Sequence, residues 1–187
     1  LVTGDEAPIL AVRWLMRLGK GDSIPPITMR LGTTRGTNAL LTRSGARTAL
    51  ITTRGFGDIL DIGYQNRPDL FELDIRKPSA LFEKVLEIDE RVTPDGVALK
   101  SLDEIAVRDQ LQQLWERKEV ESLAICLLNA YKRAAHEEAI ERIARDVGFS
   151  ETSCSSRVAP LIKLVSRGDT TVVDAYLNPV LRDYVDT

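Results

Sequence analysis

Residues 121–128 read "ESLAICLL", and this short apolar run decides the fold class. Its length and its lack of polar alternation predict a strand that is buried on both faces, as strands of parallel sheets are. Amphipathic helices are predicted on either side of it, over 103–118 and 134–147, and another strand is predicted near 151–156. This order of helix, strand, helix and strand predicts an α/β unit with a mostly parallel sheet.

The preceding part of the chain adds similar elements. "RTALITT" (47–53) is rich in β-forming residues and predicts a buried strand, with a helix over 37–44 before it and a short helical turn over 56–61 after it. "ITMRL" (27–31) predicts another short strand. The turn sequence Thr93-Pro94-Asp95-Gly96 predicts a hairpin that joins 84–92 to the segment beginning at Val97.

Helix starts are indicated by capping patterns. Thr3 to Glu6 and Ser101 to Glu104 both have the S/T-x-x-E form of a capping box, which predicts helices over 5–18 and 103–118. The last helix is predicted over 169–185, with Asp169 as its cap and a kink or break at Pro179. The alternative for its first turn is a second helix start that faces an anion.

Composition limits the functional classes. The 187 residues are 43% hydrophobic, and the net charge of -3 comes from 28 acidic and 25 basic residues without a basic stripe. We therefore expect a globular protein that binds no nucleic acid. The sequence has no apolar run of membrane-spanning length and no signal-like start, so the predicted compartment is the cytoplasm. Cys126 and Cys154 lack metal-ligand spacing and are predicted to be reduced and packed.

The stretch "LGTTRGTNALL" (31–41) places polar side chains just before an apolar helix. Backbone N–H groups and the helix dipole at such a start can bind phosphate or carboxylate. Threonine and asparagine are also ordinary N-caps, and this pattern is neither of the common phosphate-binding glycine motifs. Both interpretations stay open for this group, which consists of Gly32, Thr33, Thr34, Thr37 and Asn38.

Two other polar features have similar alternatives. Gln65, Asn66 and Arg67 carry amide and guanidinium donors on a long predicted loop, which either covers a pocket or is simply solvated. His136 is the only histidine, so a metal cluster or a two-histidine relay is not expected. A histidine satisfied at a helix start is the favoured interpretation.

Three longer blocks carry a resemblance to a known family: "GTTRGTNALLTRSGARTALITTRGFGDILDIGYQNRPDLFEL", "LAICLLNAYKRAAHEEAI" and "RGDTTVVDAYLNPVLRDYV". Together they resemble the hydantoinase A / 5-oxoprolinase family, which includes the ATP-using subunit of acetone carboxylase-type enzymes. The resemblance implies a ribonuclease H-like half of an actin-like ATPase fold, with a mixed sheet and flanking helices. We expect one compact α/β unit over 1–187, with an excursion at 63–100. We also expect a fragment of a longer protein, because the family's phosphate loops are absent from this chain.

The resemblance implies ATP-dependent ring opening of a lactam or hydantoin. ATP with Mg²⁺ would phosphorylate the amide oxygen and make the carbon open to attack by water. The residues implied for the nucleotide and substrate cleft are Gly32, Thr33, Thr34, Thr37, Asn38, Gln65, Asn66, Arg67, Arg167, Thr170 and Thr171. A hydantoinase B-like second subunit is the implied partner. This chain by itself is expected to bind ATP weakly and to be inactive.

Three positions depart from the family pattern. Leu31 stands where a His is usual, Asn129 replaces another His, and Ser166 replaces an acidic residue. These changes keep three alternatives open: a non-catalytic binding or assembly subunit, an ATP-using subunit of a ketone carboxylase, and a small-molecule kinase.

Overall fold

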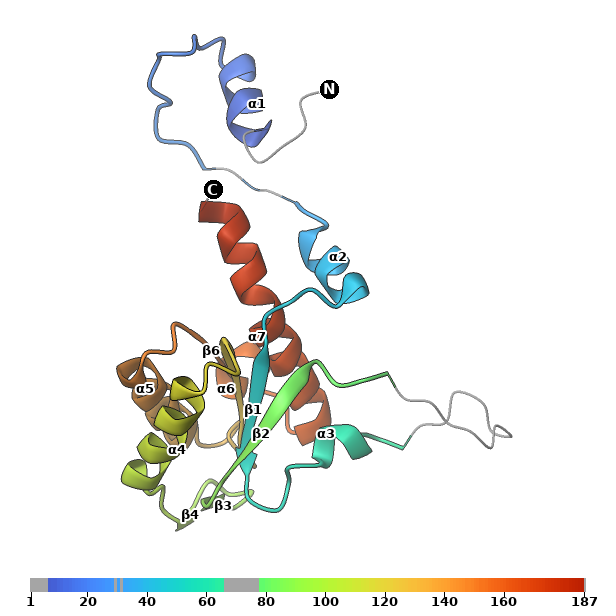
Figure 1. Ribbon diagram of the computed structural model, residues 1–187, viewed down its shortest axis with the longest axis vertical. Helices are drawn as coiled ribbons and strands as arrows, with labels where there is room; N and C mark the ends of the chain where they lie inside the picture. Colours follow the sequence, from blue (N-terminus) through green and yellow to red (C-terminus); the bar gives the residue numbers. More distant parts are fainter. Residues whose placement is uncertain (1–6, 29, 31, 66–77, 187) are drawn as a thin grey trace, which may run out of the picture.

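The computed structural model describes residues 7–28, 30, 32–65 and 78–186. The helices of this part are α1 (Ala7–Leu15), α2 (Arg35–Thr42), α3 (Ile59–Ile62), α4 (Glu104–Glu116), α5 (Ala135–Val147), α6 (Ser155–Val158) and α7 (Leu164–Asp186). Its strands are β1 (Thr48–Thr53), β2 (Phe82–Ile88), β3 (Arg91–Val92), β4 (Ala98–Lys100), β5 (Ser122–Cys126) and β6 (Glu151–Cys154). The predicted α/β class is confirmed (Figure 1).

The main sheet has the strand order β2-β1-β5-β6, and each neighbouring pair is parallel. The antiparallel pairing in the described residues lies in a separate two-stranded sheet, β3 with β4. The expected mixture of strand directions is therefore divided between two sheets instead of occurring in one. The reason is connectivity, because the strands of the main sheet are joined by segments that contain helices, whereas a tight turn joins β3 to β4.

Two strand predictions need correction. The hairpin expected from residue 84 begins only at Arg91, because β2 pairs with β1 as an edge strand of the main sheet. Part of the interval 63–100, expected as an excursion, thus belongs to the central sheet. Residues 27, 28 and 30 of the expected strand 27–31 are not in a strand. Ile27 is 47% exposed, and no described strand pairs with this segment.

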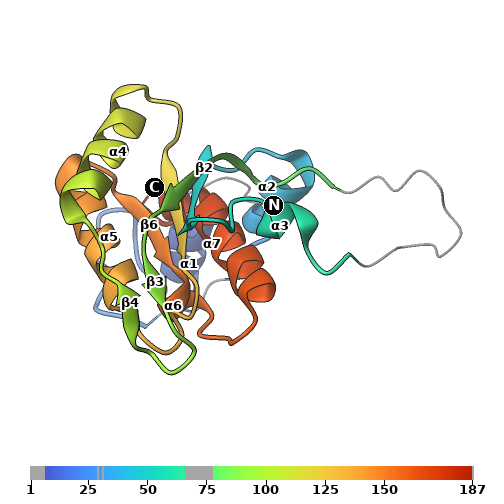
Figure 2. The same cartoon turned by 90° about the horizontal axis from the view of Figure 1, so that it is seen from below.

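Helices cover both faces of the main sheet. Ala49 and Ile51 of β1 pack in one core together with residues of α4 and α5. Leu50 points to the opposite face, where it packs with Val172 and Ala175 of α7. Figure 2 shows α4 and α5 on one side of the sheet and α7, α3 and α2 on the other. Both central strands, β1 and β5, are buried along their whole length, as their apolar sequences predict.

Helix α7 differs from the prediction at its start and in its continuity. It begins at Leu164, so Asp169 lies in its second turn and caps nothing, and it continues through Pro179. A proline removes the N–H that would bond to the carbonyl four residues earlier, here that of Ala175. The hydroxyl of Ser122 donates a hydrogen bond to this carbonyl at 2.7 Å. A partner from β5 therefore satisfies the group that the proline leaves free.

The predicted N-terminal helices form, with changes in detail. Asp103, rather than Ser101, caps α4, and its Oδ1 accepts hydrogen bonds from the N–H groups of Ile105 and Ala106 at 3.1 and 3.0 Å. The capping box at 3–6 lies outside the described residues. Helix α1 buries no residue, and its Trp14 is 80% exposed. No described helix is long and apolar enough to cross a membrane.

Candidate functional site

The topology marks one edge of the main sheet as the place to search for a ligand site. From β1 the chain continues to β2 on one side, and later strands are added on the other side, beyond β5. In open α/β sheets, ligands bind at the carboxyl ends of the strands where the order reverses in this way. Here these ends are Thr53 of β1 and the residues that follow Cys126 of β5.

A buried carboxylate lies at this edge. The hydroxyl of Thr53 donates a hydrogen bond to Glu90 and accepts one from the N–H of Leu128 at 2.9 Å. The other oxygen of Glu90 lies 2.7 Å from Nδ1 of His136, and the Glu90 side chain has no exposed surface. This contact orients the imidazole and favours the tautomer with a proton on Nδ1. The sequence analysis missed Glu90, whose partners lie 37 and 46 positions away.

A second buried carboxylate, Glu137, closes the same edge. Its Oε1 accepts hydrogen bonds from the N–H of Leu127 at 2.9 Å and the hydroxyl of Ser155 at 2.6 Å. Its Oε2 accepts one from the N–H of Ser156 at 2.9 Å. Glu137 is fully buried and therefore holds the ends of β5 and β6 to the start of α5.

Arg167, an implied cleft residue, reaches this edge from α7. It is fully buried, and its guanidinium donates to the carbonyls of Leu127 and, at 3.1 Å, Leu161. It also lies over the ring of Tyr131, with 5.6 Å from Cζ to the ring centre. The side chain is thus engaged by protein groups and holds the carboxyl edge to α7.

A cavity of about 760 Å³ lies beside α7, between α2, α3 and the segment before β2. This volume is in the usual range for small-molecule sites. Most of its lining is apolar, and the polar part includes Arg43, Asp61, Gln65 and Asp169. Partial burial raises the pKa of the Asp169 carboxyl above its usual range. Gln65 is therefore the residue of the predicted loop that the structure places at a cavity, while Asn66 and Arg67 lie outside the described residues.

The opening motif is distant from the start of α7. Arg35 of α2 lies over the ring of Tyr184 near the other end of α7, 4.5 Å from its centre. Thr170 is fourteen residues before Tyr184, which corresponds to about 21 Å along the helix. The implied site residues thus form two groups, one at each end of α7. The cavity lies along α7 and also contacts the end of α2 through Leu40 and Arg43.

The polar side chains of the opening motif are mostly not used as caps. Thr34 is the N-cap residue of α2, but its hydroxyl makes no capping hydrogen bond. The Thr33 hydroxyl accepts one from the N–H of Arg35 at 3.2 Å. Thr37 and Asn38, like these threonines and Gly32, are exposed. This helix start therefore leaves most of its hydroxyl and amide groups accessible to a ligand.

The threonines of α7 bond within their own helix. The hydroxyls of Thr170 and Thr171 donate to the carbonyls of Ser166 and Arg167, at 2.8 and 2.7 Å. Thr171 is fully buried, whereas Thr170 is exposed. The interpretation of this segment as an anion-facing helix start is wrong, because these residues lie inside α7.

Two of the positions that depart from the family pattern have structural partners. Asn129 adopts a left-handed backbone with φ of 58°, which asparagine tolerates well, and its amide donates to the carbonyl of Val92 at 2.8 Å. The hydroxyl of Ser166 lies 2.6 Å from that of Tyr64, next to Gln65. The third position, Leu31, lies outside the described residues.

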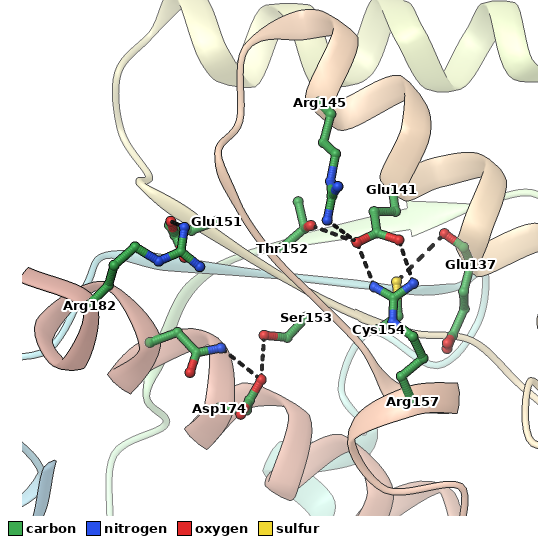
Figure 3. A network of polar contacts seen from close by, with 11 residues as sticks. Glu137, Glu141, Arg145, Glu151, Thr152, Ser153, Cys154, Arg157, Asp174 and Arg182 are labelled. Carbon is green, nitrogen blue, oxygen red and sulfur yellow. Dashed lines mark hydrogen bonds and ion pairs between the residues drawn. The ribbon is translucent and has the colours of Figure 1, made fainter. Parts of the chain in front are cut away.

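A further polar network surrounds β6 (Figure 3). Glu141 of α5 accepts hydrogen bonds from Arg157, Arg145 and Thr152, and the neighbouring Glu151 pairs with Arg182 of α7 at 2.6 Å. These contacts join β6 to helices on both sides and indicate a structural role. Among the residues that the structure describes, no group of three His, Cys, Asp or Glu side chains is arranged to hold a metal ion.

Comparisons with known proteins agree with this fold. Residues 1–148 match the family described as "Hydantoinase/oxoprolinase N-terminal region". The chain is 37% identical to 5-oxoprolinase 1 of Arabidopsis thaliana, over 97% of its own length and 16% of that protein. It is also 37% identical to the 5-oxoprolinase of Saccharomyces cerevisiae, over 97% of this chain and 17% of that protein. The chain therefore spans about a sixth of the length of these relatives.

Solved structures give the same result. The ATP-dependent caprolactamase from Pseudomonas jessenii superposes with a TM-score of 0.72 at 29% identity, over 83% of this chain and 23% of that one. Nucleotide-free acetone carboxylase superposes with a TM-score of 0.67 at 22% identity, over 81% of this chain and 24% of that one, and shows the fold alone. Both neighbours have the actin-like ATPase type of fold, which confirms the expected class. This chain belongs to the hydantoinase/oxoprolinase N-terminal region family.

Proposed function

We propose that the chain is the N-terminal region of an ATP-dependent hydrolase that opens a cyclic amide. The observation that carries the proposal is the 37% identity to 5-oxoprolinases over 97% of the chain. The structural likeness to an ATP-dependent caprolactamase supports it, because caprolactam is also a cyclic amide. ATP supplies a phosphoryl group that makes the amide oxygen a leaving group.

The two groups of implied residues receive different roles in this proposal. The start of α2, with Gly32, Thr33, Thr34, Thr37 and Asn38, faces the nucleotide, because its exposed hydroxyls and N–H groups suit phosphate oxygens. Gln65, together with Asn66 and Arg67, faces the cyclic amide at the cavity. The apolar lining of the cavity suits the methylene groups of a ring.

The remaining implied residues support the cavity wall. Arg167 and Thr171 are buried and hold the first turns of α7, while Thr170 is exposed beside Asp169. The described residues do not fit a Mg²⁺ site, since no acidic group is arranged for a metal ion. We therefore assign no step to Mg²⁺ in this chain, and we expect it to bind ATP weakly by itself.

A second subunit belongs to the proposal. One relative, 31% identical over 83% of this chain and 23% of its own length, is the caprolactamase subunit alpha of Pseudomonas jessenii, a name that implies a partner. We propose a hydantoinase B-like partner for this protein on that basis. We also place the protein in the cytoplasm, where ATP is available.

Phosphate release by the full-length gene product tests the function. It is measured with ATP and Mg²⁺, with and without 5-oxoproline, hydantoins, lactams and simple ketones, in the presence of any neighbouring partner subunit. We expect one cyclic amide to stimulate release and to yield a ring-opened acid. Thr34→Val and Asn38→Ala should each reduce the stimulated rate at least tenfold. Thr42→Val, at the other end of α2, is the matched control and should change it less than twofold.

The alternatives give different products. A binding or assembly subunit is favoured by the structural partners of Asn129 and Ser166, and it would bind nucleotide without stimulated release. A ketone carboxylase would consume ATP only with a ketone and bicarbonate. A kinase would leave a stable phosphorylated product. Ring opening with free phosphate contradicts all three.

A further inference from the structure

The cavity beside α7 has an unusual chemical character for a site that takes small rings. Its lining includes Leu60, Leu81, Phe82, Val172 and Val173. These side chains come from α3, from the segment leading into β2, from β2 itself and from α7. They form an apolar surface against which the methylene groups of a ring can pack.

Asp169 brings a negative charge to this apolar surface. It lies in the second turn of α7, lines the cavity and retains contact with solvent. In the part of the chain that the structure describes, no N–H or O–H group donates a hydrogen bond to its carboxylate and no cation pairs with it. Burial raises the pKa of this carboxyl, which is consistent with a charge that lacks compensation.

The other charged groups of the cavity do not neutralise Asp169. Asp61 adds a second carboxylate to the lining. Arg43 is the cation among the described lining residues, and its Nη1 donates to the carbonyl of Ser79 at 3.1 Å. The described part of the lining therefore carries two negative charges and one positive charge.

We propose that Asp169 determines substrate specificity, so that the cavity takes cyclic amides without a ring carboxylate. The inference rests on the proposed function. A lactam or hydantoin ring N–H can donate a hydrogen bond to the Asp169 carboxylate while its methylene groups contact the apolar lining. 5-Oxoproline has the same five-membered lactam ring with an added carboxylate, which Asp169 would repel. The protein thus differs in preferred substrate from the 5-oxoprolinases that it resembles.

Ligand binding to the full-length protein tests this inference without requiring turnover. Dissociation constants are measured by ligand-observed NMR for 2-pyrrolidone and 5-oxoproline, two rings that differ only in the carboxylate. We expect the wild-type protein to bind 2-pyrrolidone more tightly than 5-oxoproline. Asp169→Asn should shift the ratio of the two constants about tenfold toward 5-oxoproline, because a like charge a few ångströms away is removed from a partly solvated site.

The matched control is Asp109→Asn, the same change on the exposed surface of α4, across the sheet from the cavity. It should leave the ratio unchanged. A ratio that Asp169→Asn alters by less than twofold, or a wild-type protein that binds neither ring, overturns the inference. Phosphate release is measured in parallel, so selective binding without release contradicts the proposed function and leaves the specificity result standing.

Discussion

Glu137 gives the sharpest test of how this fold is held together. Its carboxylate is fully buried and accepts hydrogen bonds from Leu127, Ser155 and Ser156. In Glu137→Gln one oxygen becomes an NH₂ group, so at least one buried donor faces another donor. Leaving a buried donor unsatisfied costs about 1 to 3 kcal/mol, and the charge-assisted part of the other bonds is also lost. We expect the free energy of unfolding to fall by about 2 to 4 kcal/mol.

Urea unfolding of the chain, followed by circular dichroism, measures this loss. Glutamine is chosen because an alanine would leave all three donors unpaired and remove much of a typical total of about 5 to 15 kcal/mol. Glu138→Gln is the matched control on the same helix, where the side chain is exposed, and should change stability by less than about 0.5 kcal/mol. Equal effects of the two substitutions would refute the role assigned to Glu137.

Three further outcomes are expected. Gly45→Ala should cost at least about 1 to 3 kcal/mol in urea, because its methyl would lie 2.1 Å from Cε1 of Tyr176, and a loss below about 0.5 kcal/mol would contradict this. The Arg157 guanidinium holds the pKa of Glu141 below its usual 4.5. The stability from that pair is present above pH 4.5 and lost as the pH falls through the lower folded value, so Glu141→Gln should reduce the acid-side loss in pH-dependent urea unfolding by about 1 kcal/mol. Burial raises the pKa of Cys154 to about 12, so mass spectrometry should detect its alkylation at pH 8 only after unfolding, and rapid labelling of the native protein would contradict its burial.

The central elements could be predicted from sequence because their signals are local. The strands around residues 47–53 and 121–128 are continuous apolar runs, and the helices over 103–118 and 134–147 have a regular apolar period. The predicted elements match β1, β5, α4 and α5 closely. Burial of both cysteines also follows from their apolar or strand-like surroundings, and is confirmed.

The errors concern features that depend on distant residues. Pro179 predicted a break, but Ser122, 57 positions earlier, satisfies the carbonyl that the proline frees. Asp169 predicted a helix start because aspartate is a common cap, although α7 begins five residues earlier. β2 was assigned to a hairpin because the turn after it is conspicuous, whereas its partner β1 lies beyond a long connection.

The candidate site was predictable only in part. The accessible start of α2 and the position of Gln65 were indicated by polar clusters in the sequence. The contact of Glu90 with His136 was not, since a single glutamate after an apolar strand has no distinguishing pattern. The separation of the implied residues along α7 also required the tertiary structure, because sequence motifs carry no distances.

The continuity of α7 through Pro179 has a mechanical consequence. One rod of 23 residues contacts α2 near its C-terminal end and forms the cavity wall nearer its start. Because hydrogen bonds bridge the proline position through β5, the rod has no built-in joint at that point. A displacement of α2 against the end of α7 would therefore be transmitted to the cavity as by a lever, with the Ser122 contact as its fulcrum.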